Sequence, residues 1–317
     1  MKILLIDQAK KNFREQDHGR WHFIPYYLEK KGHKILHLTK KDWKKFLFSY
    51  LRFKPDVIIS TAYAGIIPIF FTKIGIVKCP NVHDWNDYYS EIFSHKIGLT
   101  KASFLESFVI QYSDFITTPS KYLAEKASIY GKKAEFIQHG VELNLNLKPV
   151  KLKGKIKLLY IGEQTKYKRI DRIINAVKGL NCQLYLIGKP NKKLQEIAPK
   201  NVTFLGRIPH KEIASYIKAA DICVITADQE NLKMHEYAKA GKCIIAYKGR
   251  IQYFFTHMEN AYITDNFKDG VKILIKDKKL RKRLEKTIKR FPTYSWQGVA
   301  KKYLGFLKVI KENERKI

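Results

Sequence analysis

The sequence has few cysteines and no long uninterrupted apolar run. Its 317 residues include 4 cysteines, and no two of them form a Cys-x-x-Cys pair, so neither a disulfide framework nor a common zinc-site spacing is indicated. Three of the cysteines lie in or beside apolar strand-like runs, which predicts buried core positions in a reducing compartment. The most apolar stretch, residues 57–77, contains Gly65, Pro68 and Lys73 and is therefore expected to be a strand, a loop and a helix rather than a membrane span.

Acidic residues are also scarce. The chain has 61 Lys and Arg against 29 Asp and Glu, which gives a net charge of +32. Such a surface attracts nucleic acid, acidic lipid headgroups or phosphorylated ligands, and charge alone does not choose among them. Hydrophobic residues make up 45% of the chain, which excludes disorder as the main state, and the length predicts two domains.

Short apolar runs alternate with amphipathic segments along the whole chain. One helical stripe consists of Ile170, Ile173, Ile174, Val177 and Leu180. This alternation predicts an α/β protein with parallel sheets covered by helices on both faces. The predicted strands are 2–6, 34–38, 56–60, 79–83, 114–117 and 134–137, then 157–161, 183–187, 202–205, 222–225, 243–246 and 261–263.

The series of strands and helices restarts once, after a polar segment at residues 143–156 that lacks a helical period. We therefore predict two doubly wound Rossmann-like domains that face each other across a cleft, at residues 1–148 and 149–293. Residues 294–317 are expected to form an amphipathic helix that crosses back to the first domain. Ligands of open α/β sheets bind at the carboxyl ends of the strands, so we expect the binding site there.

Polar residues in the second half follow two of these strands. Gly162 and Lys168 lie at a strand–glycine–helix junction, where backbone N–H groups and a lysine can hold a phosphate. Asp228 follows another strand, Asn231 is a good helix N-cap, and Glu236 lies eight residues after Asp228. These carboxylates can accept hydrogen bonds from sugar and ribose hydroxyls. Taken alone, each carboxylate is better explained as a cap or a solvated surface residue, and Lys168 as a solvated surface lysine.

The spacing of these residues resembles that of the nucleotide-sugar domain of retaining family-four glycosyltransferases of the GT-B fold (glycosyl transferases group 1). Their pattern is Gly-Arg, a short gap, Lys-Gly, and later Glu, seven residues, Glu. Here Lys168 lies six residues after Gly162, Arg207 follows a strand, and seven residues separate Asp228 from Glu236.

Two positions depart from the pattern. Glu163 replaces the family's arginine, so that one diphosphate contact is missing or is supplied elsewhere, with Lys166 as one option. Asp228 is one methylene shorter than the usual glutamate. The resemblance assigns catalysis to His83 and Lys168. It assigns donor binding to Gly19, Gly162, Arg207, Asp228, Asn231, Leu232 and Glu236.

In the first half, the resemblance extends over the opening strand, loop and helix. It assigns to Gly19 a close backbone approach to the donor phosphates, although an ordinary turn glycine would also fit. His83 belongs to a Pro–strand–His–Asp segment and is predicted to reach the cleft and bind a sugar hydroxyl; the alternative is a structural histidine. Asp84 and Asp87 are weaker predictions for acceptor contact.

A basic apolar segment at residues 40–54 bears on location. As a helix it carries Trp43, Phe46, Leu47, Tyr50 and Leu51 on one stripe. The stripe suits packing on the sheet, and the bases suit an anionic membrane surface. Phe48 and Phe53 lie off the stripe and can serve the second role.

The function implied is transfer of a sugar from a nucleoside diphosphate sugar to an acceptor, such as a lipid-linked or cell-surface polysaccharide precursor, with retention of configuration. The resemblance implies no cofactor and no metal, and the cleft motifs contain no Asp-x-Asp. We expect a cytoplasmic enzyme, peripheral on the inner face of the membrane, with no nucleic-acid partner. Three alternatives stay open: a catalytically silent sugar-nucleotide-binding subunit, a basic nucleic-acid-binding protein and an epimerase of the same architecture.

Overall fold

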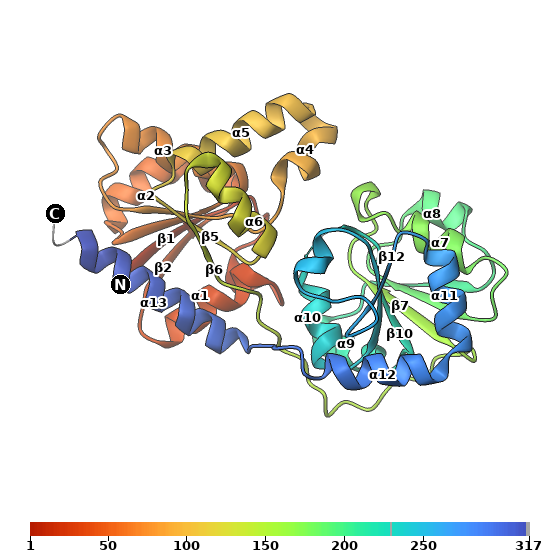
Figure 1. The fold of residues 1–317 in the computed structure, drawn as a ribbon. Helices are drawn as coiled ribbons and strands as arrows, with labels where there is room; N and C mark the ends of the chain where they lie inside the picture. Colours follow the sequence, from red (N-terminus) through yellow and green to blue (C-terminus); the bar gives the residue numbers. More distant parts are fainter. Residues whose placement is uncertain (229, 315–317) are drawn as a thin grey trace. The chain divides into compact units, whose positions relative to one another are not determined.

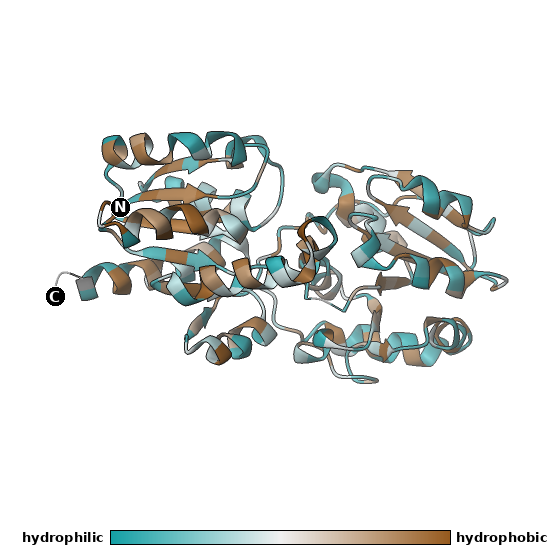
Figure 2. Ribbon diagram, turned by 90° about the horizontal axis from the view of Figure 1, so that it is seen from above, coloured by the Kyte–Doolittle hydropathy of each residue, from teal (hydrophilic) through white to brown (hydrophobic). Residues whose placement is uncertain are grey.

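A computed structural model describes residues 1–228 and 230–314. The chain divides into two compact units, Met1–Gly140 with Tyr294–Ile317 and Val141–Thr293 (Figure 1). Each unit is built on its own parallel sheet. Figure 2 shows that the strands of both sheets are hydrophobic, whereas the helices mix hydrophobic and hydrophilic residues. This is the pattern of strands that helices cover on both faces.

The first unit has a six-stranded parallel sheet of order β2-β1-β3-β4-β5-β6. Because β2 lies on one side of β1 and the later strands lie on the other, the strand order reverses between β1 and β3. The strands are β1 (Lys2–Ile6), β2 (Lys34–Leu38), β3 (Val57–Thr61), β4 (Asn81–Asp84), β5 (Phe115–Thr118) and β6 (Ala134–Phe136).

Helices cover both faces of this sheet. The helix α1 (Arg20–Lys30) packs with α13 (Trp296–Glu314) on one face, where Trp21 meets Tyr303 edge to face and Phe23 stacks on Trp296. The other face carries the helices α2 (Phe46–Phe53), α3 (Ile66–Lys73), α4 (Tyr89–Ile97), α5 (Leu99–Tyr112) and α6 (Lys121–Lys126) (Figure 1). Short 3₁₀ turns are η1 (Phe13–Glu15), η2 (Lys40–Lys45), η3 (Ala62–Gly65) and η4 (Ala127–Tyr130).

The second unit has a six-stranded parallel sheet of order β12-β11-β10-β7-β8-β9. This is the dinucleotide-binding order, in which the direction of winding reverses between β7 and β10. The strands are β7 (Lys157–Ile161), β8 (Gln183–Ile187), β9 (Val202–Gly206), β10 (Ile222–Ile225), β11 (Cys243–Tyr247) and β12 (Tyr262–Thr264).

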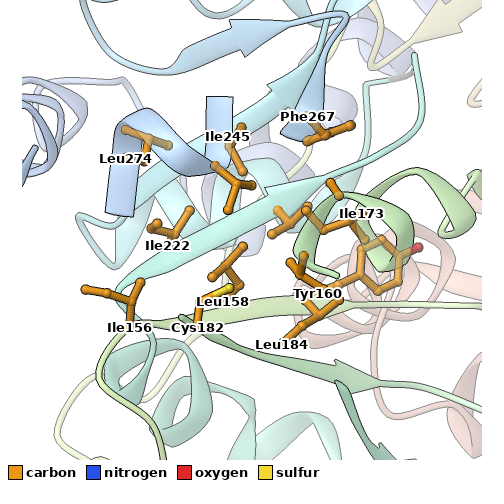
Figure 3. Packing of buried hydrophobic residues seen from close by; sticks show 14 of the residues in the cluster. Ile156, Leu158, Tyr160, Ile173, Cys182, Leu184, Ile222, Ile245, Phe267 and Leu274 are labelled. Carbon is orange, nitrogen blue, oxygen red and sulfur yellow. The ribbon is translucent and has the colours of Figure 1, made fainter. Parts of the chain in front are cut away.

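Alternate residues of β7 face two different cores. Leu158 and Tyr160 pack with α7 (Asp171–Val177), α11 (Phe267–Lys276) and α12 (Lys278–Ile288) (Figure 3). Leu159 packs on the other side with α9 (Ile213–Ala219) and α10 (Leu232–Lys239). The remaining elements of this unit are α8 (Lys192–Glu196) and the turns η5 (Lys166–Lys168), η6 (His210–Glu212) and η7 (Arg250–Tyr253).

The first unit ends at Gly140, eight residues before the predicted boundary. The intervening segment is held by the second unit, because Lys218 Nζ donates to the carbonyl oxygens of Leu145 at 2.8 Å and Leu147 at 2.7 Å. The helix α7 ends at Val177, short of the predicted stripe, since Lys178 leaves the helical conformation. In the described residues, no helix combines the length and apolar composition needed to cross a bilayer. All four cysteines are free, and Cys79 is half-buried while the other three are buried.

Candidate functional site

The loops that follow β7 and β10 meet where the strand order of the second unit reverses. Thr226, directly after β10, donates through Oγ1 to the carbonyl oxygen of Lys168 at 2.5 Å. The carbonyl oxygen of Thr226 accepts from Arg172 Nη1 at 3.1 Å. These bonds fix the loop of Lys168 against the end of β10. Ligands of such sheets bind at this position, outside the carboxyl ends of the strands.

Two glycines bring the backbone of this edge together. Gly162 follows β7 with a φ of +134°, and Gly188 follows β8 with a φ of +139°. A Cβ on Gly188 would lie 2.0 Å from the carbonyl oxygen of Gly162, so the two loops touch as only glycine allows. Gly162 therefore lies at the edge where it was predicted, in a conformation that other residues rarely adopt.

Lys168 ends the turn η5, just before α7. Its side chain is half-buried, and its ammonium lies 4.5 Å from the centroid of the Tyr167 ring. Lys166 and Glu163, which precede it in the same loop, are exposed. The loop thus presents cationic side chains at the sheet edge, while Glu163 can point into solvent.

The first turns of α10 carry three of the predicted donor-binding residues. Asn231 is the N-cap residue, as predicted, but its side chain makes no capping bond, and Leu232 begins the helix. Glu236 is 4% exposed, and its Oε1 lies 2.7 Å from Nε2 of His210. This partner was not predictable from the sequence, because His210 lies in a turn 26 residues away. The pair holds the carboxylate of Glu236 in one orientation.

Asp228 is fixed by the loop after β11. The backbone N–H of Arg250 donates to Asp228 Oδ1, and Arg250 Nε donates to the carbonyl oxygen of Asp228 at 2.9 Å. The Nε atom also lies 3.6 Å from Asp228 Oδ2. A Cβ on Gly249 would lie 2.1 Å from Oδ1, so the loop passes tightly over the carboxylate. Arg207, after β9, is exposed.

A cavity of about 310 Å³ lies at the corresponding edge of the first unit, where β1 and β3 end. Gly19, Thr61, Ala62, Asp87 and Tyr89 are among the residues that line it. Gly19 is the N-cap residue of α1 and has a φ of +101°. A Cβ there would meet no atom within 4 Å, so its backbone faces open space. Gly19, predicted to bind the donor, and Asp87, predicted to contact the acceptor, thus line one cavity.

Asp84 has a structural environment instead of the predicted acceptor contact. Its carboxylate is fully buried and pairs with Arg20, whose Nη2 lies 2.8 Å from Oδ2. Thr117 Oγ1 also donates to Oδ2, at 2.7 Å. Arg20 Nη1 donates to the carbonyl oxygen of Ile137 at 2.8 Å, and its guanidinium lies over the ring of Tyr303. Because these partners come from α1, β4, β5 and α13, the pair joins the elements beneath the cavity.

His83 lies inside β4 rather than after it. It is 1% exposed, its Nδ1 is 3.2 Å from Ser60 Oγ, and Gly65 packs directly against it. Burial lowers the pKa of His83 to about 3, so the ring is neutral at physiological pH. The residues that line the cavity do not include His83. The prediction that its side chain reaches the cleft does not fit this burial, which corresponds to the structural alternative.

Among the described residues, no three His, Cys, Asp or Glu side chains gather as a metal site would require. The charged groups described above at the two sheet edges are lysines, arginines and carboxylates. Of these groups, Arg20 and Asp87 line the cavity of the first unit.

The comparisons with known proteins agree with this architecture. Residues 145–291 match the family described as glycosyl transferases group 1. An uncharacterized glycosyltransferase of Methanocaldococcus jannaschii is 22% identical over 292 residues, which span 81% of this chain and 69% of the relative.

Two solved structures share the fold. Sucrose-phosphate synthase from Thermosynechococcus elongatus has a TM-score of 0.80 at 16% identity, with 98% of each chain covered. UDP-GlcNAc 2-epimerase from Methanocaldococcus jannaschii has a TM-score of 0.60 at 12% identity, with 98% of this chain and 100% of that chain covered. The chain has the GT-B fold, and the family match and the curated relative support glycosyltransferase activity.

Proposed function

We propose that the protein is a retaining glycosyltransferase that transfers a sugar from a nucleoside diphosphate sugar to an acceptor hydroxyl or phosphate. The observation that carries the proposal is the assembly at the edge of the second unit. There the buried carboxylate of Glu236, the loop of Lys168 and the first turn of α10 lie where the strand order reverses. A carboxylate for ribose and cations for phosphate are the groups that such a donor needs.

Each residue of this edge has a proposed contact. Glu236 accepts hydrogen bonds from the ribose hydroxyls, and His210 holds its carboxylate in place. Lys168 and the N–H groups of Asn231 and Leu232 bind phosphate oxygens. Three further contacts complete the donor site: Asp228 binds the sugar, Arg207 lies beside the base, and Gly162 lets the backbone approach the phosphates.

The first unit is proposed to hold the acceptor in the cavity bordered by Asp87. Gly19 lines the same cavity, and its approach to the donor phosphates stays a prediction from the resemblance. In the transfer, the bond between the anomeric carbon and the diphosphate oxygen breaks, and the acceptor oxygen forms a bond on the same face of the sugar. The acceptor proton passes to the departing diphosphate. Lys168 stabilises the charge that develops on that leaving group, without a requirement for a metal or a cofactor.

The acceptor is proposed to be lipid-linked or a polysaccharide precursor, because one face of the first unit suits an anionic membrane. Exposed bases accompany exposed apolar side chains on adjacent helices. Phe46 of α2 stacks on Phe71 of α3, and the ammonium of Lys73 lies 4.5 Å from the ring centroid of Tyr112 in α5. We call this surface the basic apolar face. It consists of Phe48, Leu51, Arg52, Phe70, Lys73, Ile74, Lys101, Phe104 and Tyr112.

We propose two roles for the segment at residues 40–54, packing on the core and contact with the membrane. Phe46 is buried in the core below, and Phe53 packs against the same core, unlike its predicted outward role. Phe48 and Leu51 are exposed, at 66% and 56%. Bases beside such side chains add about 1 kcal/mol each to the binding of an anionic bilayer. Flotation with vesicles tests this: Phe48→Ser with Phe104→Ser should reduce binding to anionic vesicles, while Val309→Ser, on α13 and 55% exposed, should not.

Product analysis tests the proposed activity. The protein is incubated with UDP- and GDP-sugars and with membrane lipid extract, and released nucleoside diphosphate and glycosylated product are measured. The proposal predicts a new glycosidic bond with the anomeric configuration of the donor, and loss of product in Glu236→Ala. The matched control is Glu196→Ala, at an exposed position of α8. Inversion of configuration overturns the retaining proposal. Binding of donor without transfer indicates a silent subunit, and a changed sugar still attached to nucleotide indicates an epimerase.

A further inference from the structure

The ammonium of Lys233 lies among the donor-site elements, and none of the described acidic residues forms an ion pair with it. Lys233 is the second residue of α10, and its Nζ is 3.8 Å from the centroid of the Tyr160 ring at the end of β7. A Cβ on Gly162 would lie 2.8 Å from this Nζ, so the ammonium rests against the Gly162 backbone. A residue of α10 thereby reaches the glycine that opens the loop of Lys168.

No described residue neutralises this charge through an ion pair or a hydrogen bond with the side chain. The side chain is half-buried, and the charged groups that act on it are Lys168, Glu236 and Glu163. The carboxylate of Glu236 is paired with His210, and the side chain of Glu163 is exposed. Burial, with repulsion from Lys168, holds the pKa of Lys233 well below its usual range. Placing a cation here costs free energy that a bound anion would recover.

The position of Lys233 also bears on Glu163, which departs from the sequence pattern of the resembling family. The resembling family has an arginine directly after the glycine, where this chain has Glu163. Lys166, the substitute considered from the sequence, is exposed. Lys233 comes from a different element, yet its ammonium lies beside Gly162 itself.

We infer that Lys233 binds the diphosphate of the donor and supplies the cation that Glu163 does not. The inference rests on the proposed function and deepens it. Lys233 and Lys168 would then both place an ammonium group on the phosphate oxygens. The N–H groups of the first turn of α10 would approach the same phosphate from the end of the helix. The like charge of two lysines, unfavourable in the empty site, becomes favourable once a dianionic phosphate group lies between them.

Calorimetric titration of the full chain with UDP, GDP and the matching nucleosides tests this role. Lys233→Met keeps the apolar stem and removes the charge. It should weaken binding of the diphosphate about ten- to a hundredfold and leave binding of the nucleoside unchanged, because a hydrogen bond to a charged group is lost. Lys233→Arg should restore most of the affinity. The control is Lys239→Ala, at an exposed position of the same helix, which should bind like the wild type.

The stability of the empty protein gives an independent measurement. Because Lys233→Met removes a half-buried charge without a partner, its melting temperature should equal or exceed that of the wild type. Diphosphate affinity that is unchanged in Lys233→Met but lost in Glu236→Ala overturns the role of Lys233 and leaves the donor site standing. Absence of binding of either diphosphate to the wild type overturns both proposals.

Discussion

The two units are built from the same elements but bury charge differently. Each has six parallel strands, and each has polar groups where its strand order reverses. In the first unit, Arg20 and Asp84 neutralise each other beneath the cavity. In the second, no ion pair to Lys233 is found among the described residues, and the charge of Lys168 repels it. A neutralised pair holds a scaffold together, whereas an uncompensated cation is arranged for a ligand that brings the opposite charge.

Breaking the neutral pair should have the largest effect on stability. Arg20→Ala leaves the Asp84 carboxylate buried without its cation and should lower the free energy of unfolding by about 3–5 kcal/mol. Hydrogen exchange resolved along the chain should place the loss in the first unit. Arg14→Ala, which removes a partly exposed ion pair with Glu29, should cost less than about 1 kcal/mol. Equal costs for the two variants would show that the buried pair does not hold the first unit together.

Substitution of two glycines distinguishes the cost of a steric clash from the cost of a strained backbone conformation. Gly188→Ala combines a positive φ with a Cβ 2.0 Å from the carbonyl oxygen of Gly162, and should cost about 3 kcal/mol. Gly19→Ala has the strain but open space, and should cost about 1 kcal/mol. Urea unfolding measures both. A cost for Gly188→Ala no greater than that for Gly19→Ala would mean that the loops of the second unit are not held in contact.

Acid should weaken both units through one buried histidine each. Burial lowers the pKa of His83 to about 3 and that of His235 to about 4. The unfolded chain takes up a proton on each near pH 6.5, while the folded chain does not. Stability is therefore present above pH 6.5 and falls as the pH drops toward 4, by about 1.4 kcal/mol per pH unit for each histidine. His235→Phe should reduce the slope for the second unit only, in urea unfolding followed by hydrogen exchange. An unchanged slope would contradict the assignment.

Local pattern predicted the architecture well, because parallel strands buried on both faces are continuous apolar runs between helical stripes. All twelve predicted strands overlap strands of the structure. The pairings across the fold were not predictable. His210 with Glu236, and Lys233 with Gly162, join residues that are close only after the sheet has formed. For the same reason, the pairing of Arg20 with Asp84, which lie 64 residues apart, was not predicted. The motif placed His83 at a strand end that reaches the cleft, whereas all of β4 is buried and His83 packs against Ser60 and Gly65.

A thermal-shift screen tests whether the second unit binds a nucleoside diphosphate sugar. Wild type and Glu236→Ala are melted with UDP, GDP, UDP-sugars and GDP-mannose. A ligand at 100 times its Kd adds about 2.7 kcal/mol of stability, which is an easily measured shift. We expect a shift with one nucleotide family that disappears in Glu236→Ala. No shift with any of these ligands, in a folded wild-type sample, would contradict it.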